Sequence, residues 1–396
     1  MPTVALKPGH VQPVWSGHPW VYAQAVASIQ GGATAGDEVS VVDPHGNFLG
    51  RGFYSPGSAI PVRIATRSEA TRLDAAWLRA SLSRAHQLRR EMGLPTARTN
   101  AFRLVHAEGD LLPGLIVDRF ADVAAVQLTT IGMHVRRELV LDAVQAVLGV
   151  ETIVDRSPAK HATAEGFTPD SGVVRGRRQL DAFRFMERGF VYEVPLTLGQ
   201  KTGYYFDQRP LRARIEQLAR GRRVLDGYCF VGSFAMAAAR GGATEVHAVD
   251  ENLLALEVGA RLAEANGVAR TIRHTRSAVR DVLAAAGRQG GYDLVLLDPP
   301  SMAPSARDAD RATRAFRRLA ADGCRAVRPG GLLVVSSCSA AVTLDGLTRA
   351  VALGARDAAT YATVVERWFQ GADHPVPAAF SEGLYLKSMI ARIEPR

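Results

Sequence analysis

Three aspartates in the second half of the sequence each stand at the end of a mainly apolar segment. An acid at the end of a buried strand can bind a polar ligand. They are Asp226, Asp250 and Asp298. Asp250 stands 24 residues after Asp226, and an acid at the end of a second strand can accept hydrogen bonds from both ribose hydroxyls of a nucleoside cofactor. Alternatively, Asp250 caps the helix that follows it. The agreement of the three acids favours the ribose interpretation.

The loop after Asp226 reads DGYCFVGSF and lacks the GxGxxG pattern. A pyrophosphate needs close backbone approach at several glycines, and only Gly232 lies at the start of the expected helix. The loop therefore argues against a dinucleotide and for a cofactor without phosphates. We expect Tyr228 and Gly232 to line that cofactor.

Asp298 is followed by Pro299 and Pro300, which stiffen the chain and fix the direction of its carboxyl group. Such a corner can hold a planar base. Enzymes that methylate exocyclic amines usually place an aromatic residue next, but here Ser301 and Met302 follow.

Cys338 ends another apolar segment, LLVVSSC. A free cysteine is often a small buried core residue. If the two segments are neighbouring strands, however, Cys338 faces Asp298 across one pocket. A thiolate that attacks cytosine C6 makes C5 able to accept a methyl group, and a carboxyl group can bond N3 and the amine. We therefore predict Cys338 as the nucleophile and Asp298 as its partner.

Four arginines after the Asp-Pro-Pro corner share one face of an expected helix by their spacing. Phosphate contact and a solvated helix face explain them equally well. They are Arg307, Arg311, Arg314 and Arg318.

The elements that must position these residues alternate between strand and helix from about residue 222, which indicates a doubly wound parallel sheet. The expected strands are 223–226, 246–250, 292–298 and 332–337, with a helix from near Gly232 to Gly241. Residues 11–66 are typical of short strands in a small β-barrel. Residues 72–92 are expected to form a helix. From 102 to 185, strands such as 124–129 flank a helix near 134–148, which indicates a separate α+β unit. The segment 175–178 is an expected exposed linker.

The composition favours a polyanionic partner. The chain has 396 residues and a net charge of +9, which suits nucleic acid, although a general preference for arginine contributes. We find no signal peptide and no run of 18 apolar residues. The three cysteines have neither disulfide nor metal-ligand spacing, so we expect a cytoplasmic protein without metal or membrane partners.

Motifs along nearly the whole chain resemble the large-subunit ribosomal RNA methyltransferase I family, the 23S rRNA cytosine-C5 methyltransferases. The most specific is Lys201–Arg209, KTGYYFDQR. Others are GHPWV from Gly17, RGFYSP from Arg51, FRLVHAE from Phe102, LPGLIVDR from Leu112, Asp298-Pro299-Pro300, Ser337-Cys338-Ser339, Asp373-His374-Pro375 and Glu382–Lys387.

This resemblance implies an α/β fold, with a PUA-like RNA-binding domain over 1–70, a central α+β domain over 71–188 and a Rossmann-like methyltransferase domain over 189–396. The implied cofactor is S-adenosylmethionine, and the implied partner is 23S ribosomal RNA. Cys338 matches the nucleophile. The cofactor-binding residues that we expect are Lys201, Tyr204, Phe206, Gln208, Arg209, Asp226, Tyr228, Gly232, Asp250, Ser277 and Asp298, and the substrate-binding residues are Pro299, Pro300, Arg307, Arg311 and Arg314.

The chain departs from the family at two places near the cofactor. Ser233 replaces the second glycine of a Gly-Gly pair, and no acid stands after the third strand, where Ser277 is the nearest polar substitute. Some cytosine methyltransferases use a second cysteine beside the Asp-Pro corner, and this chain has none there. The base that removes the C5 proton is therefore not identified.

Three hypotheses follow. The first is cytosine C5 methylation in ribosomal RNA. The second is methylation of an exocyclic amine such as guanine N2, which needs no cysteine. The third is a weakly active or non-catalytic RNA-binding assembly factor. The sequence leaves open the target nucleotide and whether the chain forms a homodimer.

Overall fold

The computed structural model describes residues 1–396 except 178, 199–201, 289–290 and 303–307. The chain forms two compact units. Unit 1 contains residues 1–206 and 372–383, and unit 2 contains residues 207–371 and 384–396. The chain therefore passes between the units three times, after residues 206, 371 and 383. These two units do not correspond one to one with the three domains expected from the sequence, so the limits of those domains stay a proposal.

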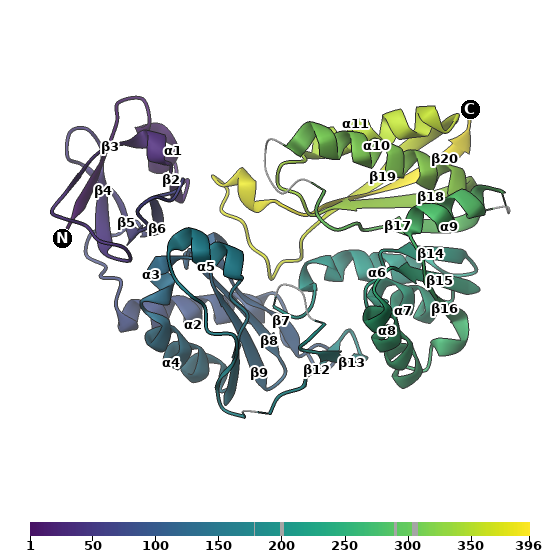
Figure 1. Cartoon of the computed structure of the whole chain (residues 1–396), viewed down its shortest axis with the longest axis horizontal. Coiled ribbons are helices and arrows are strands. Elements are labelled where there is room, and N and C mark those ends of the chain that lie inside the picture. Colours follow the sequence, from purple (N-terminus) through teal and green to yellow (C-terminus); the bar gives the residue numbers. More distant parts are fainter. Residues whose placement is uncertain (178, 199–201, 289–290, 303–307) are drawn as a thin grey trace. The chain divides into compact units, whose positions relative to one another are not determined.

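The N-terminal part of unit 1 is a six-stranded sheet around a small apolar core (Figure 1). Its order is β2-β6-β5-β4-β1-β3. The prediction of strands throughout 11–66 was wrong at its start, where α1 (Val11–Trp15) is a single helical turn. Val11 and Val14 pack on the core three residues apart, a spacing too short to distinguish helix from strand. The strands are β1 (Thr3–Leu6), β2 (Trp20–Val21), β3 (Val26–Gln30), β4 (Glu38–Val42), β5 (Phe48–Tyr54) and β6 (Val62–Thr66).

The central part of unit 1 is a five-stranded sheet in the order β11-β10-β9-β8-β7. Helices α2 and α4 pack against each other and share a buried core with this sheet. The linker expected at 175–178 was wrong at Arg175, which ends β11 and forms an ion pair with Glu138. The elements are α2 (Ala75–Glu91), β7 (Ala101–His106), β8 (Leu115–Phe120), β9 (Val123–Leu128), α3 (Ile131–His134), α4 (Arg137–Leu148), β10 (Thr152–Asp155), α5 (Ala159–Glu165) and β11 (Gly172–Arg175).

A hairpin of β12 (Ala182–Glu187) and β13 (Phe190–Pro195) completes the regular strands of unit 1. Its two turn residues, Arg188 and Gly189, both have positive φ, as a tight hairpin turn requires. Phe185 stacks on Tyr192 across the pair, and Tyr204 and Phe206 contact Phe185. The hairpin therefore carries an aromatic cluster against which the segment with Tyr204 and Phe206 packs.

Unit 2 is a seven-stranded sheet in the order β16-β15-β14-β17-β18-β20-β19. All neighbouring pairs are parallel except β18–β20 and β19–β20. Figure 1 shows α6, α7 and α8 on one face of the sheet and α9, α10 and α11 on the other. The central strands are buried on both faces, which explains why their sequences are apolar without alternation.

The elements of unit 2 match the alternation expected from the sequence, and β18 begins five residues earlier than expected. They are α6 (Arg209–Leu218), β14 (Arg223–Gly227), α7 (Ser233–Arg240), β15 (Glu245–Asp250), α8 (Leu253–Ala265), β16 (Ile272–Arg276), α9 (Val279–Arg288), β17 (Tyr292–Leu297), α10 (Ala309–Ala326), β18 (Val327–Ser337), α11 (Leu344–Asp357), β19 (Thr360–Phe369) and β20 (Lys387–Pro395).

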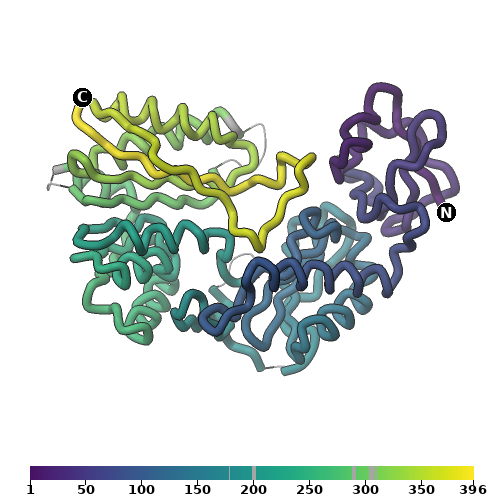
Figure 2. Tube along the Cα trace, turned by 180° about the vertical axis from the view of Figure 1, so that it is seen from behind, coloured from purple at the N-terminus to yellow at the C-terminus, as the bar shows by residue number. Residues whose placement is uncertain are grey.

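The chain between β19 and β20 leaves the sheet as a long excursion, drawn in yellow in Figure 2. Its residues 372–383 belong to unit 1. There, Arg89 donates to the main-chain oxygen of Asp373 at 2.8 Å, and the Arg103 amide donates to its carboxylate at 3.2 Å. Within unit 1, Phe380 packs on Trp20 with a ring separation of 4.6 Å. Buried polar and aromatic contacts thus fix this segment.

Candidate active site

The three aspartates predicted from the sequence follow strands that are adjacent in unit 2. β14 lies between β15 and β17, and the strand order reverses at the β14–β17 pair. Ligands of such sheets bind beyond the carboxyl ends of the strands at this reversal. Asp226 is the last residue but one of β14, Asp250 ends β15, and Asp298 directly follows β17.

Asp226 is fully buried at 1% exposure, and one carboxylate oxygen accepts the Ala235 amide at 2.9 Å. Burial, together with the charges of Asp298 and Asp250, raises the pKa of Asp226 to about 8. The three acids therefore influence one another through their charges. A positively charged ligand group would relieve their repulsion.

Asp250 shapes the loop between β14 and α7. Its Oδ2 accepts the amide of Phe230 and its Oδ1 the amide of Asn252, both at 2.9 Å. The alternative that Asp250 caps α8 is wrong, because Asn252 is the cap and accepts the Ala255 amide at 3.2 Å. A carboxylate oxygen has two acceptor sites, so these two bonds leave capacity for ribose hydroxyls.

The loop held by Asp250 has an unusual backbone. Tyr228 and Phe230 have φ values of 64° and 51°, and Gly232 has a φ of 72°. Positive φ is uncommon for bulky residues and is found where surrounding contacts enforce it, often at ligand sites. Gly232 is buried, and a Cβ there would meet a His274 nitrogen at 3.7 Å and the Ala235 Cβ at 3.8 Å, which are ordinary contacts. The positive φ, and not a lack of space, therefore explains the glycine at this position.

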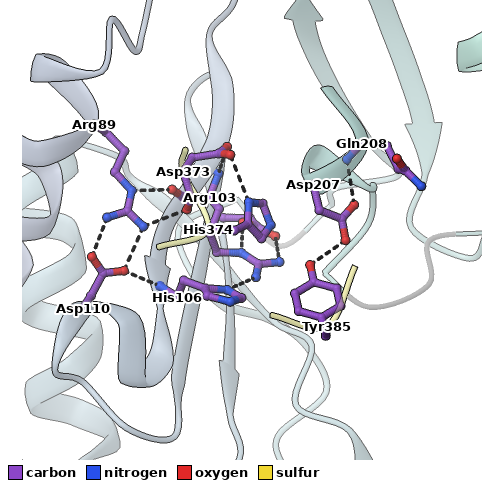
Figure 3. Close-up of polar contacts among 10 residues, drawn as sticks. Arg89, Arg103, His106, Asp110, Asp207, Gln208, Asp373, His374 and Tyr385 are labelled. Carbon is purple, nitrogen blue, oxygen red and sulfur yellow. Dashed lines mark hydrogen bonds and ion pairs between the residues drawn. The ribbon is translucent and has the colours of Figure 1, made fainter. Parts of the chain in front are cut away.

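Gln208 connects the start of unit 2 to the Asp-Pro-Pro corner. Its Nε2 donates to Asp298 Oδ2 at 3.0 Å, and its side chain is buried. Asp207 holds this residue, because its Oδ1 accepts the Gln208 amide at 3.1 Å and its Oδ2 accepts the Tyr385 hydroxyl at 2.6 Å. Figure 3 shows the Tyr385 hydroxyl directed at the Asp207 carboxylate, and the Gln208 side chain directed away from it. Asp207 and Tyr385 were not predicted as site residues, although both lie in family motifs.

Cys338 follows β18 directly, beside the strand that leads to Asp298. The parallel pairing sets Leu297 opposite Val335. The next loops meet as well, because the hydroxyl oxygens of Ser301 and Ser339 lie 3.0 Å apart. Cys338 is half-buried, whereas the other two cysteines are buried. The structure thus brings the Asp298 corner and the Cys338 turn together.

Ser277 also lies near the acids. Its amide donates to the main-chain oxygen of Asp250 at 3.1 Å, and its hydroxyl donates to the Ala278 carbonyl at 3.3 Å. Ser233 begins α7 and is buried. The two departures from the family pattern therefore flank the Asp250 loop.

Other predicted site residues lie elsewhere or cannot be placed. Lys201 and Arg307 fall outside the described residues. Tyr204 and Phe206 pack in the aromatic cluster of unit 1, where the Tyr204 hydroxyl donates to Glu187 at 3.1 Å. Arg209 begins α6 one residue after Gln208.

The predicted substrate contacts lie along the corner and α10. Pro299 is buried and Pro300 exposed. Arg311 and Arg314 are exposed on α10, and Arg311 pairs with Asp308 at 2.8 Å, so part of this face is an ordinary solvated helix surface. Both explanations of the arginine face stay open.

Among the residues that the structure describes, no helix is long and apolar enough to cross a membrane. No cluster of three or more potential metal ligands occurs among the same residues.

The fold and the acid cluster define a class of enzyme that sequence comparison also identifies. Residues 103–386 match the family of S-adenosylmethionine-dependent methyltransferases, and residues 4–67 match a PUA-like domain. The chain is therefore an S-adenosylmethionine-dependent methyltransferase with an N-terminal PUA-like domain, as predicted.

Curated relatives specify the family further. The chain is 34% identical to the ribosomal RNA large subunit methyltransferase I of Shewanella denitrificans, over 98% of this chain and 99% of that protein. It is 33% identical to the protein of the same name from Alteromonas mediterranea, over 98% of both. The chain belongs to the ribosomal RNA large subunit methyltransferase I family.

A solved structure described as a SAM-dependent methyltransferase from Streptococcus mutans has the same fold over the whole chain. Its TM-score is 0.85 at 19% identity, with 99% of this chain and 100% of that chain covered. A methyltransferase structure in complex with SAH aligns with a TM-score of 0.86, also at 19% identity over 99% of this chain.

The described residues fit S-adenosylmethionine. This cofactor carries a positive sulfonium and a positive α-amino group, which suit a cluster of three acids around the buried Asp226. It has ribose hydroxyls for Asp250 and no phosphate that would need a glycine-rich loop. When bound, the cofactor supplies an electrophilic methyl group.

Proposed function

We propose that this protein methylates C5 of a cytosine in 23S ribosomal RNA, with the Cys338 thiolate as nucleophile. The names of its relatives support ribosomal RNA of the large subunit as substrate. The observation that carries the cytosine proposal is the 3.0 Å contact between Ser301 and Ser339, which joins the loop after Asp298 to the loop after Cys338.

The chemistry requires a nucleophile because cytosine C5 alone reacts poorly with a methyl donor. The Cys338 sulfur forms a bond to C6, and the electron pair of the C5–C6 double bond then takes the methyl group at C5. Loss of the C5 proton to a base restores the double bond as the S–C6 bond breaks, which returns the thiolate. A half-buried cysteine can meet a base in this way, whereas the buried Cys229 and Cys324 cannot.

Asp298 is proposed to bind the N3 and amino edge of the cytosine as charge develops there. Two features fix the orientation of the Asp298 carboxylate. One is the Pro299-Pro300 pair after it, and the other is the 3.0 Å hydrogen bond from Gln208. Preorganised groups of this kind lose little energy to reorientation during the reaction.

The remaining roles stay part of the proposal. Asp226, Tyr228, Gly232, Asp250 and Ser277 are proposed to line the cofactor, together with Gln208 and Arg209 of the KTGYYFDQR motif. The PUA-like domain is proposed to bind structured RNA by shape. A cytoplasmic location and a homodimer stay predictions.

A trapping experiment tests the mechanism directly. An RNA with 5-fluorocytidine at the target position has no C5 proton to lose, so the S–C6 bond should persist after methyl transfer. We expect a covalent protein–RNA complex with the wild-type protein and none with Cys338→Ala, while Cys324→Ala, a change at a buried cysteine, forms the complex as before. A complex formed by Cys338→Ala would overturn the assignment.

A further inference from the structure

Lys387 is a buried lysine to which the proposed mechanism assigns no role. It begins β20 and is 3% exposed. Its Nζ donates to the main-chain oxygen of Ser339 at 2.9 Å. Among the residues that the structure describes, no carboxylate lies within 4.0 Å of this ammonium group. Burial of a lysine without an acid partner is costly, so its retention needs a reason.

The pairing of strands explains how Lys387 reaches this position. β20 runs antiparallel to β18 with Lys387 opposite Ser337, the residue before Cys338. From there the side chain extends to Ser339, the residue after Cys338. The ammonium group therefore holds the turn that carries the proposed nucleophile.

Among the described residues, Cys338 is the group whose negative charge favours the charged form of Lys387. Burial lowers the pKa of Lys387, and the negative charge of the Cys338 thiolate opposes this effect. β19 carries Glu366 and Arg367, but Glu366 pairs with Arg214 and with Trp368 instead.

Helix α11, which also packs on β20, carries Asp345, Arg349, Arg356 and Asp357. Asp357 pairs with Arg317 instead, and burial and Cys338 are the causes that shift the pKa of Lys387. Attraction between two charges is mutual, so a cation that Cys338 stabilises must in turn stabilise the Cys338 thiolate.

We propose that Lys387 is a positioning residue that keeps Cys338 as the thiolate and fixes the turn of residues 337–339. A thiolate, and not a thiol, is the nucleophile, and a nearby lysine favours that form. This inference rests on the proposed function, because a nucleophilic Cys338 must be ionised to attack the base.

The rate at which iodoacetamide alkylates Cys338 tests the inference without RNA or cofactor. Cys229 and Cys324 are buried, and Cys338→Ala provides the background rate. We expect Lys387→Met to lower the rate at pH 7 about tenfold, which corresponds to a shift of about one pH unit in thiolate formation. At a pH where every exposed thiol is ionised, the variant should match the wild type.

Two further variants separate charge from structure. Lys387→Arg keeps the positive charge and should restore most of the rate at pH 7. Lys7→Met makes the same replacement at an exposed lysine that also donates to one carbonyl, of Gln24, and should change nothing. The unfolding temperature of Lys387→Met should not fall, because the change removes a buried charge without an acid partner.

Equal alkylation of wild type and Lys387→Met at pH 7 would overturn the inference. A loss of equal size at every pH would also overturn it, since that result reports altered access and not ionisation. The proposed function fails separately, if Cys338→Ala methylates cytosine.

Discussion

The Tyr385 hydroxyl donates to Asp207 Oδ2 at 2.6 Å, and the same carboxylate accepts the Gln208 amide through its other oxygen (Figure 3). The main-chain oxygen of Asp207 also accepts the Gly371 amide at 3.1 Å. Asp207, Gly371 and Leu384 are the unit 2 residues at the three passages of the chain between the units. Asp207 is therefore the unit 2 residue at the first passage, bonds Gly371 at the second, and bonds Tyr385, one residue after the third. It also holds Gln208, whose side chain binds Asp298.

Tyr385→Phe should lower the single-turnover rate of methyl transfer about tenfold. Loss of the hydroxyl loosens Asp207 and then Gln208, and small misplacements at a reacting centre are expensive in rate. The unfolding temperature should change little, because one hydrogen bond contributes about 1 kcal/mol. Tyr361→Phe is the matched control, since Tyr361 is 56% exposed. Equal rates for Tyr385→Phe and the control would contradict a positioning role of Asp207.

Asp226 should make stability depend on pH. Its pKa is raised from 3.8 to about 8 in the folded protein. Between these values the unfolded chain has released the proton and the folded chain retains it, so stability falls as pH rises from about 4 to about 8. In Asp226→Asn, the free energy of unfolding from urea titrations should differ less between pH 5 and pH 8. Asp281→Asn changes an exposed acid and should keep the wild-type difference. An unchanged pH dependence in Asp226→Asn would show that Asp226 is ionised in the folded state.

Asp250→Ala should weaken the binding of S-adenosylmethionine about 100-fold, since two charge-assisted hydrogen bonds to the ribose are lost. Isothermal titration calorimetry measures this effect, with Asp281→Ala on the exposed start of α9 as the control. An affinity within a factor of two of the wild type would exclude the ribose role.

Arg103→Met should destabilise unit 1 by about 3–5 kcal/mol, because it leaves the fully buried Asp118 carboxylate without its ion pair. Two guanidinium nitrogens of Arg103 donate to Asp118, which also accepts the Thr202 hydroxyl. Arg184→Met, which breaks exposed pairs with Asp181 and Glu193, should cost little stability, because solvent screens these pairs. Chemical denaturation compares the two, and similar losses would contradict the importance of burial.

The sequence predicted the acids of the site because one rule covers them all: parallel strands bring their carboxyl ends to one edge. Asp226, Asp250 and Asp298 needed only correct strand assignments. Asn252 shows the limit of such local rules. It caps α8, whereas the sequence offered Asp250, two residues earlier, as the alternative cap.

The contacts of Tyr385 and Lys387 could not be predicted in this way. Asp207 and Tyr385 are 178 residues apart, and Ser339 and Lys387 are 48 apart. Both contacts depend on the antiparallel register of β20 on β18, which follows from the packing of the whole sheet. The anchoring of Asp373 by Arg89 joins residues 284 apart, and a motif alone did not indicate this contact.

The most direct test of the central claim is methyl transfer from labelled S-adenosylmethionine to ribosomal RNA, followed by mass spectrometry of the nucleosides, for wild type and Cys338→Ala. The account predicts 5-methylcytidine with the wild type and no labelled nucleoside with Cys338→Ala, although the variant still binds the cofactor. A methylated purine, or 5-methylcytidine formed by Cys338→Ala, would contradict it.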